Sequence, residues 1–353
     1  MGKYNIYKRK DGRFEGRLYC TENGSRSYRS FYGSSYDDVV RRIDSLLPDY
    51  EKTEITVREL LDKWLQSVIP RVKQSTASNY QMKLNRHILP YFSAIRCCDF
   101  SPSDVYSFIN KKESEGLSSR YISDMIVLIK SAFRFAARTL RIFNPLDGVH
   151  FQKQERSEIQ ILNTDQQKKL TARFSNSPTH TDVGIALSLY TGLRIGEVCA
   201  MKWSDIDLDK RILTVNHTIQ RIQNFEGGNK TRLVITEPKS VHSKRTIPIP
   251  DGIIPLLKRF QGDKESFILS GTDKPVEPRT MQNRFAAILK NENLPSVHYH
   301  SLRHAFATRA VEVGFDIKTL SEILGHSSVE LTLNLYVHSS LERKRTCMNL
   351  MTV

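Results

Sequence analysis

The periodicity of the hydrophobic residues changes twice along this chain, and these changes constrain its fold more than any other feature. The first part alternates apolar and polar side chains, which is typical of half-buried strands. The second part carries apolar residues at helical spacing, and the third mixes both patterns. Short polar segments at 51–54 and 152–157 lie between the parts. The sequence therefore predicts a multidomain protein whose domains are residues 1–50, 55–150 and 160–353.

The first part is predicted to be a small three-stranded β-sheet with one helix. Strands are indicated near Ile6, at Phe14–Tyr19 and at Arg26–Tyr32, and Asn23-Gly24 is a strong hairpin signal. A short helix is expected from Ser35 to Leu47.

Basic and aromatic side chains are interleaved in this first part. Residues 1–33 contain eight bases against three acids. Such side chains on a small sheet suit a β-sheet reader of a DNA groove, although a solvated sheet face is the alternative. The bases expected to contact DNA are Lys8, Arg9, Lys10, Arg13, Arg17, Arg26 and Arg29.

The second part is predicted to be an all-α domain of four helices. Residues that favour helix N-termini precede the four apolar runs, namely Thr56 with Glu59, Ser75, Ser101 with Pro102, and Ser118. Pro70 is expected to end the first helix and Asn144-Pro145 the last. The charged exterior of this domain supplies further candidates for DNA contact, which are Arg71, Lys73, Lys83 and Arg86.

The third part is predicted to be an α+β domain that is mostly helical. A helix is expected to open at Asn163-Thr164-Asp165, and an apolar helix is expected at Asp182–Tyr190. Strands are indicated at Ile212–Ile222, Arg232–Thr236 and Arg245–Pro250.

The net charge of +15 and the pI near 9.6 indicate a polyanionic partner, without separating DNA from RNA or a binder from an enzyme. No apolar run approaches the length of a membrane span, and the N-terminus has no secretory pattern. The five cysteines include no C-x-x-C pair, which argues against disulfides and a cysteine zinc site. We therefore expect a cytoplasmic protein without a metal or cofactor.

Four segments of the third part combine charge with small residues. They read T-G-L-R-I-G-E at 191–197, E-P-K-S at 237–240, H-S-L-R-H at 300–304, and L-G-H at 324–326 followed by Y-V-H at 336–338. Each has an ordinary explanation when taken alone. Arg194 and Glu197 can form an exposed helical salt bridge worth only ~0.3–0.5 kcal/mol. His298, His300 and His304 do not supply the ligand set that zinc needs.

Taken together and in this order, the four segments resemble the catalytic blocks of the tyrosine recombinase (phage integrase) family. The resemblance implies a helical core-binding domain at 55–150 and a catalytic domain at 160–353. The N-terminal sheet resembles the arm-DNA-binding domain of integrases from phages and conjugative transposons. The function implied is that of a site-specific DNA recombinase, which integrates or excises a mobile element through a covalent 3′-phosphotyrosyl intermediate.

The resemblance also implies roles for individual residues. The expected catalytic set is Arg194, His300, Arg303 and His326 around the scissile phosphate, Lys239 near the leaving oxygen, and Tyr336 as the nucleophile. Glu197 is expected to orient a cationic neighbour. Lys244 and Arg245 are nearby basic residues that compete with Lys239 for its assignment.

The chemistry of these residue types agrees with the resemblance. A guanidinium is planar, permanently charged and bidentate, so two arginines suit a phosphate that gains charge during attack. A tyrosine with a pKa near 10 needs a base, and a departing 5′-oxygen needs an acid. Neither ATP nor a metal is required, and the chain has no G-x-x-x-x-G-K-[ST] loop.

The family's partners are double-stranded DNA with core and arm sites, three further copies of the chain in a tetramer on DNA, and an excisionase or DNA-bending accessory protein. The tail Ser339–Val353 is expected to pack against a neighbouring subunit through Leu341, Met348, Leu350 and Met351, and the bacterial nucleoid is the expected location. Two other functions remain open. One is a type IB topoisomerase-like enzyme, and the other is a DNA-binding regulatory or architectural protein with an inactive recombinase domain.

Overall fold

The computed structural model describes residues 5–22, 25–46, 54–140, 160–224, 231–238, 243–326 and 328–336, together with 142, 144–147, 149, 345, 348 and 349. The hairpin signal Asn23-Gly24, the predicted polar segment at 152–157, Lys239 and most of the tail lie outside these residues. The chain divides into two compact units, Met1–Glu155 and Arg156–Val353, and each is described by itself.

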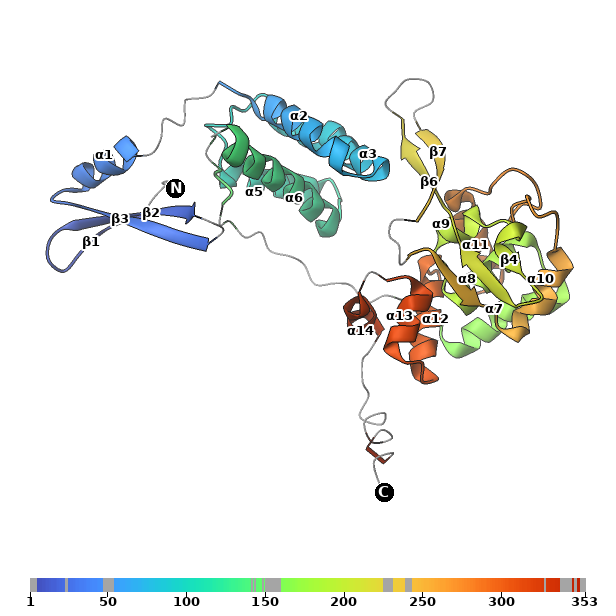
Figure 1. Ribbon diagram of the computed structural model, residues 1–353. Coiled ribbons are helices and arrows are strands. Elements are labelled where there is room, and N and C mark those ends of the chain that lie inside the picture. The colour runs from blue at the N-terminus through green and yellow to red at the C-terminus, as the bar shows by residue number, and fades with distance from the viewer. Residues whose placement is uncertain are drawn as a thin grey trace. The chain divides into compact units, whose positions relative to one another are not determined.

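The N-terminal residues form the expected three-stranded sheet with one helix (Figure 1). The strands β1 (Asn5–Lys8), β2 (Phe14–Glu22) and β3 (Ser25–Gly33) pair antiparallel in the order β1-β2-β3. Helix α1 (Tyr36–Leu46) packs on one face through Val39 and Ile43, which are fully buried. A Cβ at Gly16 would lie 2.5 Å from Ile43 and 2.6 Å from Val39, so glycine lets the helix approach the sheet closely.

The first unit continues with helices α2 (Val57–Val68), α3 (Gln74–Lys83), α4 (Leu89–Phe92), α5 (Pro102–Ser114) and α6 (Ser119–Phe135). Thr56 and Glu59 form the predicted capping box, in which the Thr56 amide donates to Glu59 at 2.8 Å. Ser118 caps α6 as expected. The apolar faces of these helices meet in one core that includes Phe92, Phe108 and Phe133.

Two helix boundaries of this region differ from the sequence prediction. Helix α3 begins after Lys73, which makes no side-chain cap, so the prediction that Ser75 caps it is wrong. Helix α6 ends at Phe135 and passes into a π-helical turn at Ala136–Leu140, before the Asn144-Pro145 signal. In the second case the α-helix gives way to a wider π-helical turn, with i→i+5 hydrogen bonds, before any proline is reached.

The second unit is α+β and mostly helical, as predicted. Its helices are α7 (Thr164–Asn176), α8 (His180–Thr191), α9 (Ile195–Ala200), α10 (Ile254–Phe260), α11 (Pro278–Asn291), α12 (His300–Glu312), α13 (Ile317–Leu324) and α14 (Val329–Tyr336). Strands β4 (Ile206–Asp207), β5 (Ile212–Val215) and β8 (Arg245–Pro248) form one antiparallel sheet, and β6 (Thr218–Gln223) pairs with β7 (Thr231–Thr236).

The expected single strand Ile212–Ile222 is two strands that belong to different sheets. The break lies at Asn216 and His217, where the Asn216 side chain donates to Asp205 at 2.8 Å. The break redirects β6, which then contacts helix α9.

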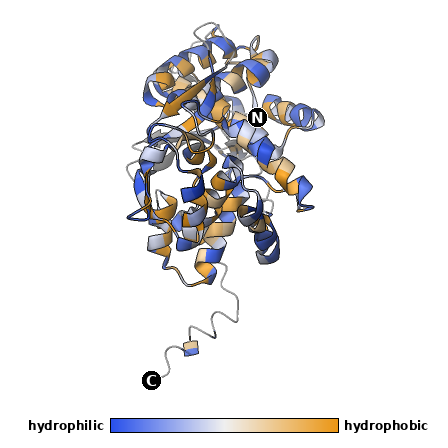
Figure 2. Ribbon diagram, turned by 90° about the vertical axis from the view of Figure 1, so that its right-hand side faces the viewer, coloured by the Kyte–Doolittle hydropathy of each residue, from blue (hydrophilic) through white to orange (hydrophobic). Residues whose placement is uncertain are grey.

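Helix α8 is the central element of the second unit's core. Ten of its twelve residues are buried, so it carries no polar face. The other helices show the mixture of hydrophobic and hydrophilic residues that surface helices carry (Figure 2). Among the described residues, none of the helices has the length and apolar character that a bilayer span needs.

Candidate active site

A sharp turn between α8 and α9 positions Arg194. Gly192 ends α8 in the left-handed conformation with a φ of 69°, where L side chains are disfavoured. A Cβ there would lie 2.6 Å from Phe306 and 2.8 Å from Leu324. Arg194 then precedes the first turn of α9, and its backbone amide donates to Glu197 at 2.9 Å. The motif T-G-L-R-I-G-E is therefore a tight turn with its arginine held at the start of a helix.

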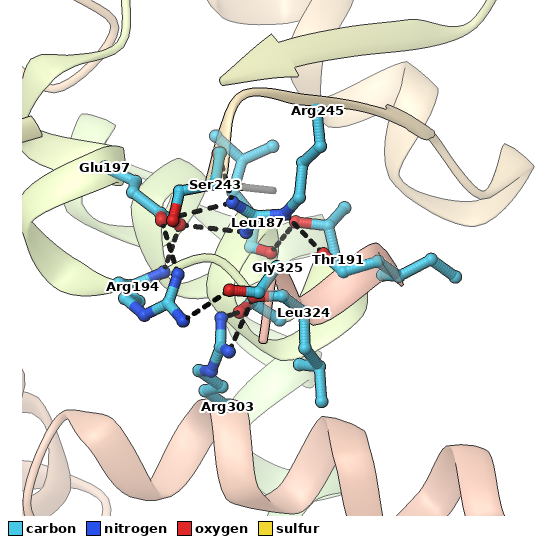
Figure 3. A network of polar contacts seen from close by, with 11 residues as sticks. Leu187, Thr191, Arg194, Glu197, Ser243, Arg245, Arg303, Leu324 and Gly325 are labelled. Atoms are coloured by element: carbon cyan, nitrogen blue, oxygen red, sulfur yellow. Dashed lines mark hydrogen bonds and ion pairs between the residues drawn. The ribbon is translucent and has the colours of Figure 1, made fainter. Parts of the chain in front are cut away.

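Glu197 is buried and binds two arginines (Figure 3). Arg194 Nη1 donates to Glu197 Oε1 at 2.8 Å. Arg245 donates to both carboxylate oxygens, from Nη1 at 3.2 Å and from Nη2 at 3.0 Å. Burial raises the pKa of the Glu197 carboxyl, but Arg245 and Arg194 outweigh burial and hold the pKa below its ordinary value. Glu197 is therefore a carboxylate shared by two guanidinium groups.

Arg303 lies on α12 and is only 2% exposed. Its Nη1 donates to the carbonyl of Gly192 at 2.7 Å, and its Nη2 donates to the carbonyl of Leu324 at 2.7 Å. Arg194 Nη2 donates to the next carbonyl, that of Gly325, at 3.1 Å. The two predicted catalytic arginines thus meet at the C-terminal end of α13 (Figure 3).

The two predicted catalytic histidines are neutral at pH 7. Burial, followed by the charges of Arg303 and Arg194, lowers the pKa of His326 to about 4. Although His300 reaches the surface, desolvation and then the charges of His304, Arg303 and Arg194 lower its pKa to about 4 as well. His326 Nδ1 lies 2.8 Å from the hydroxyl of Thr332, which is fully buried.

His300 and His304 stack edge to face with ring centroids 4.7 Å apart. Within the part of the chain that the structure describes, no three His, Cys, Asp or Glu residues lie together in a way that would hold a metal ion. The i, i+4 histidine pair lies near Arg303 of α12, whose charge contributes to the lowered pKa of both rings.

Two members of the expected catalytic set are not described at the level of side chains. Tyr336 is the last residue of α14, and only its backbone is described. Lys239 lies outside the described residues. The structure thus brings together Arg194, Glu197, Arg303, His300 and His326.

Two further residues of the site were not assigned to it by the sequence. Arg245 was expected only as a competitor of Lys239, yet it binds Glu197. Thr332 was not singled out, and it contacts His326. Its position four residues before Tyr336, on the same helix, is the signal that would have found it.

On the N-terminal sheet, the predicted DNA contacts surround a buried acid. Glu15 is 3% exposed, and it lies opposite Tyr7 and Tyr32 in the strand register, on the face away from α1. Arg9 Nη1 and Arg17 Nε each donate to Glu15 at 2.9 Å. These contacts, led by the hydrogen bond from Arg17 and followed by the one from Tyr7, lower the pKa of Glu15 to about 2.

The remaining basic candidates differ in exposure. Lys8, Lys10 and Arg13 are exposed, and Arg13 pairs with Asp11 at 2.8 Å. The backbones of Arg26 and Arg29 lie in β3, and their side chains are not described. In the helical region Arg71, Lys73 and Arg86 are exposed.

Lys83 does not lie on the exterior, so that prediction is wrong. It is 5% exposed, and its Nζ donates to Asp124 of α6 at 2.9 Å. The ammonium group also lies 5.2 Å from the ring centre of Tyr121. An ion pair and an aromatic face on the neighbouring helix offset the cost of its burial.

Comparisons with known proteins identify the family. Residues 160–343 match the phage integrase family, and residues 56–112 match the N-terminal SAM-like domain of phage integrases. The chain belongs to the phage integrase family. It is a site-specific DNA recombinase of the tyrosine type, and neither the topoisomerase nor the inactive regulatory protein is favoured by these matches.

Individual relatives agree with this assignment. The chain is 25% identical to a tyrosine recombinase XerC-like protein of Caldanaerobacter subterraneus subsp. tengcongensis, over 90% of this chain and 89% of the relative. It is 25% identical to the Tn1549 transposon integrase in complex with circular intermediate DNA, over 84% of this chain and 100% of that one, with a TM-score of 0.70. The lambda integrase tetramer bound to a Holliday junction shares its fold at 20% identity, with coverage of 92% and 96% and a TM-score of 0.58.

Proposed function

We propose that this recombinase cuts a DNA strand by attack of Tyr336 on a phosphate that Arg194, Arg303 and His326 bind. The observation that carries the proposal is the meeting of two arginines from distant helices at the C-terminal end of α13, beside two neutral histidines. In this arrangement two fixed cations face the charge that develops in phosphoryl transfer.

The proton transfers follow from the states of the side chains. At pH 7 the phenolate of a tyrosine lies roughly 4 kcal/mol uphill, from a pKa of about 10 and about 1.36 kcal/mol per pKa unit. The arginines lower this cost, and we assign His300, whose ring is unprotonated at pH 7, as the proton acceptor. The negative phosphate of the bound DNA offsets the arginine charges, which raises the pKa of this ring above the value of about 4 that it has in the free protein. His326 donates a hydrogen bond to a non-bridging oxygen. Lys239 protonates the leaving 5′-oxygen.

The covalent product is a 3′-phosphotyrosyl bond, which retains the energy of the broken backbone linkage. A 5′-hydroxyl of another strand then attacks this bond, and Tyr336 leaves. Exchange of two duplexes requires four such cuts, so we propose a homotetramer on DNA. The shared fold with the lambda integrase tetramer on a Holliday junction supports this assembly.

The three regions divide the DNA contacts among them. We assign residues 1–50 to an arm site, the helical region 55–150 to the core site, and 160–353 to catalysis. Exposed Lys8, Lys10, Arg71, Lys73 and Arg86 support this division. The likeness to the Tn1549 transposon integrase supports a mobile element as the substrate. We further propose an excisionase or DNA-bending protein as accessory partner and the bacterial nucleoid as the location.

A nicked suicide duplex that carries the core site tests the proposal. Loss of the short fragment beyond the nick prevents religation, so a covalent adduct accumulates. We expect an adduct with the wild-type protein and none with Tyr336→Phe, while both bind the duplex with equal affinity. An adduct of equal yield with Tyr336→Phe would remove this residue as the nucleophile.

A further inference from the structure

Three successive carbonyls at the C-terminal end of α13 accept hydrogen bonds from three different arginines. The carbonyl of Ile323 accepts from Arg245 Nε, that of Leu324 from Arg303 Nη2, and that of Gly325 from Arg194 Nη2. These carbonyls are at the negative end of a helix, which favours cations. The residue that follows them is His326. Any shift of this helix end would therefore move both proposed catalytic arginines and a proposed catalytic histidine together.

Arg245 is the one of the three that has no proposed contact with substrate. Its side chain is 6% exposed, and its guanidinium donates hydrogen bonds to groups of the protein. Besides Ile323 it binds both oxygens of Glu197 and the carbonyl of Ser243. Figure 3 shows its guanidinium directed at Glu197. A guanidinium with these partners cannot act as the general acid, because it does not deprotonate in proteins.

We propose that Arg245 is a positioning residue for strand cleavage, which acts through Glu197 and the end of α13. The proposal rests on the cleavage reaction proposed above. Arg194, Glu197 and Arg245 together carry a net charge of +1, because one carboxylate serves two guanidinium groups. Without Arg245 the whole carboxylate charge would pair with Arg194. The cation facing the phosphate would then be neutralised by its own neighbour.

Arg245 also ties β8 to α13. Its backbone lies in β8, and its Nε reaches the carbonyl of Ile323 across 78 residues of sequence. The same side chain therefore sets both the electrostatic balance of Arg194 and the position of the helix end that holds Arg194 and Arg303. If Glu197 were paired with Arg194 alone, no side chain of this group would connect β8 to the end of α13.

The test compares three variants in the full-length protein on the suicide duplex. Arg245→Met removes the charge, and we expect single-turnover cleavage to fall by about tenfold or more, with the affinity for the core duplex unchanged. Arg245→Lys keeps the charge but not the fork, so its rate should lie between those of the wild type and Arg245→Met. Adding Glu197→Gln to Arg245→Met removes the unbalanced carboxylate, and we expect this double variant to cleave faster than Arg245→Met.

Arg173→Met is the matched control. Arg173 also holds a buried carboxylate of the second unit, that of Asp182, at 3.1 Å. Asp182 lies in the first turn of α8, at the opposite end of that helix from Gly192. We expect this control to lose thermal stability but not cleavage rate.

Each outcome decides between defined conclusions. Cleavage by Arg245→Met within twofold of the wild-type rate would overturn the positioning role. A double variant no faster than Arg245→Met would reduce Arg245 to a structural residue, as would an equal loss of rate in Arg173→Met. Absence of an adduct with the wild-type protein would instead contradict the proposed cleavage reaction itself.

Discussion

At the scale of single residues, the site is organised by charges that the protein neutralises only in part. Glu197 balances one positive charge of the pair Arg194 and Arg245, while Arg303 is bound by neutral carbonyls. Burial and, after it, these surplus cations keep His300 and His326 neutral. The free enzyme thus holds a site of positive potential, with two uncharged groups ready to accept or donate hydrogen bonds.

The neutral histidines predict a pH dependence of stability. The pKa of His326 is about 4 in the folded protein, against about 6.5 when unfolded. Between these values the unfolded chain binds more protons, so the free energy of unfolding should rise as the pH increases from about 4 to about 6.5. The groups around this ring are Arg303, Arg194, Arg245 and His300.

Chemical denaturation of the free protein across this pH range measures the effect. Carboxylates also titrate near its lower end, so the comparison with His326→Asn isolates the histidine. We expect a smaller pH slope in that variant and an unchanged slope in His217→Asn, which alters an exposed histidine outside the site. Equal slopes in wild type and His326→Asn would show that His326 keeps an ordinary pKa.

At the scale of elements, the two left-handed glycines set the site's geometry. Gly192 ends α8 and Gly325 ends α13, and the carbonyl of each accepts from a proposed catalytic arginine. The turn at Gly192 is also crowded by Phe306 and Leu324. A side chain at this position would therefore be strained in its backbone and would press on α12, which carries Arg303, and on the end of α13, which His326 follows.

Gly192→Ala is expected to destabilise the protein by about 2–4 kcal/mol, which combines the cost of a left-handed alanine with overpacking. Gly116→Ala is the control, because Gly116 has a φ of 79° but no neighbour within 4 Å. It should cost only about 1–2 kcal/mol. Denaturant midpoints with unchanged slopes measure both values. Equal losses in the two variants would mean that the contacts at Gly192 carry no strain.

Local sequence signals predicted where a helix begins when a side chain bonds to the backbone of the first turn. The caps at Thr56, Ser118 and Asn163 each begin a helix as expected. The prediction that Ser75 caps a helix was wrong, because α3 begins after Lys73 without a side-chain cap. The prediction that Lys83 is exposed was wrong, because helical spacing alone does not show which charged residue faces a neighbouring helix.

The sequence predicted the motif residues of the candidate site, but it did not predict the hydrogen bonds that join them to the rest of the domain. Arg194, Arg303, His300 and His326 are brought together as their order in the four segments suggested. The bond from Arg245 to Glu197 spans 48 residues and depends on how the chain places β8, which contacts α13, beside the start of α9. No spacing rule contains that contact, since it is a property of tertiary packing.

At the scale of the whole molecule, the net charge of +15 is distributed over regions with different tasks. Few of the basic residues belong to the proposed site, and exposed bases occur in both units, among them Lys8 and Arg71 in the first and Lys210 and Lys258 in the second. Contacts of exposed bases with phosphates release counterions and depend on salt. The surplus charge should therefore govern affinity, and the buried arginines should govern rate.

A chain that lacks residues 1–50 tests this division. We expect it to cleave a core-site suicide duplex at the wild-type rate, because the arginine cluster lies entirely in the second unit. Its binding to DNA that carries both core and arm sites should weaken, with a shallower dependence on salt concentration. Titrations at several salt concentrations give both slopes. An unchanged slope would contradict the assignment of the N-terminal bases to an arm site.

The most direct test of the central claim is the location of the covalent bond in the adduct. The wild-type adduct formed on the suicide duplex is digested with trypsin and nuclease, and the modified peptide is sequenced by mass spectrometry. The account predicts a nucleotide linked through its 3′-phosphate to Tyr336, in a yield that falls in Arg245→Met and not in Arg173→Met. A nucleotide on any other residue, or a link through a 5′-phosphate, would contradict it.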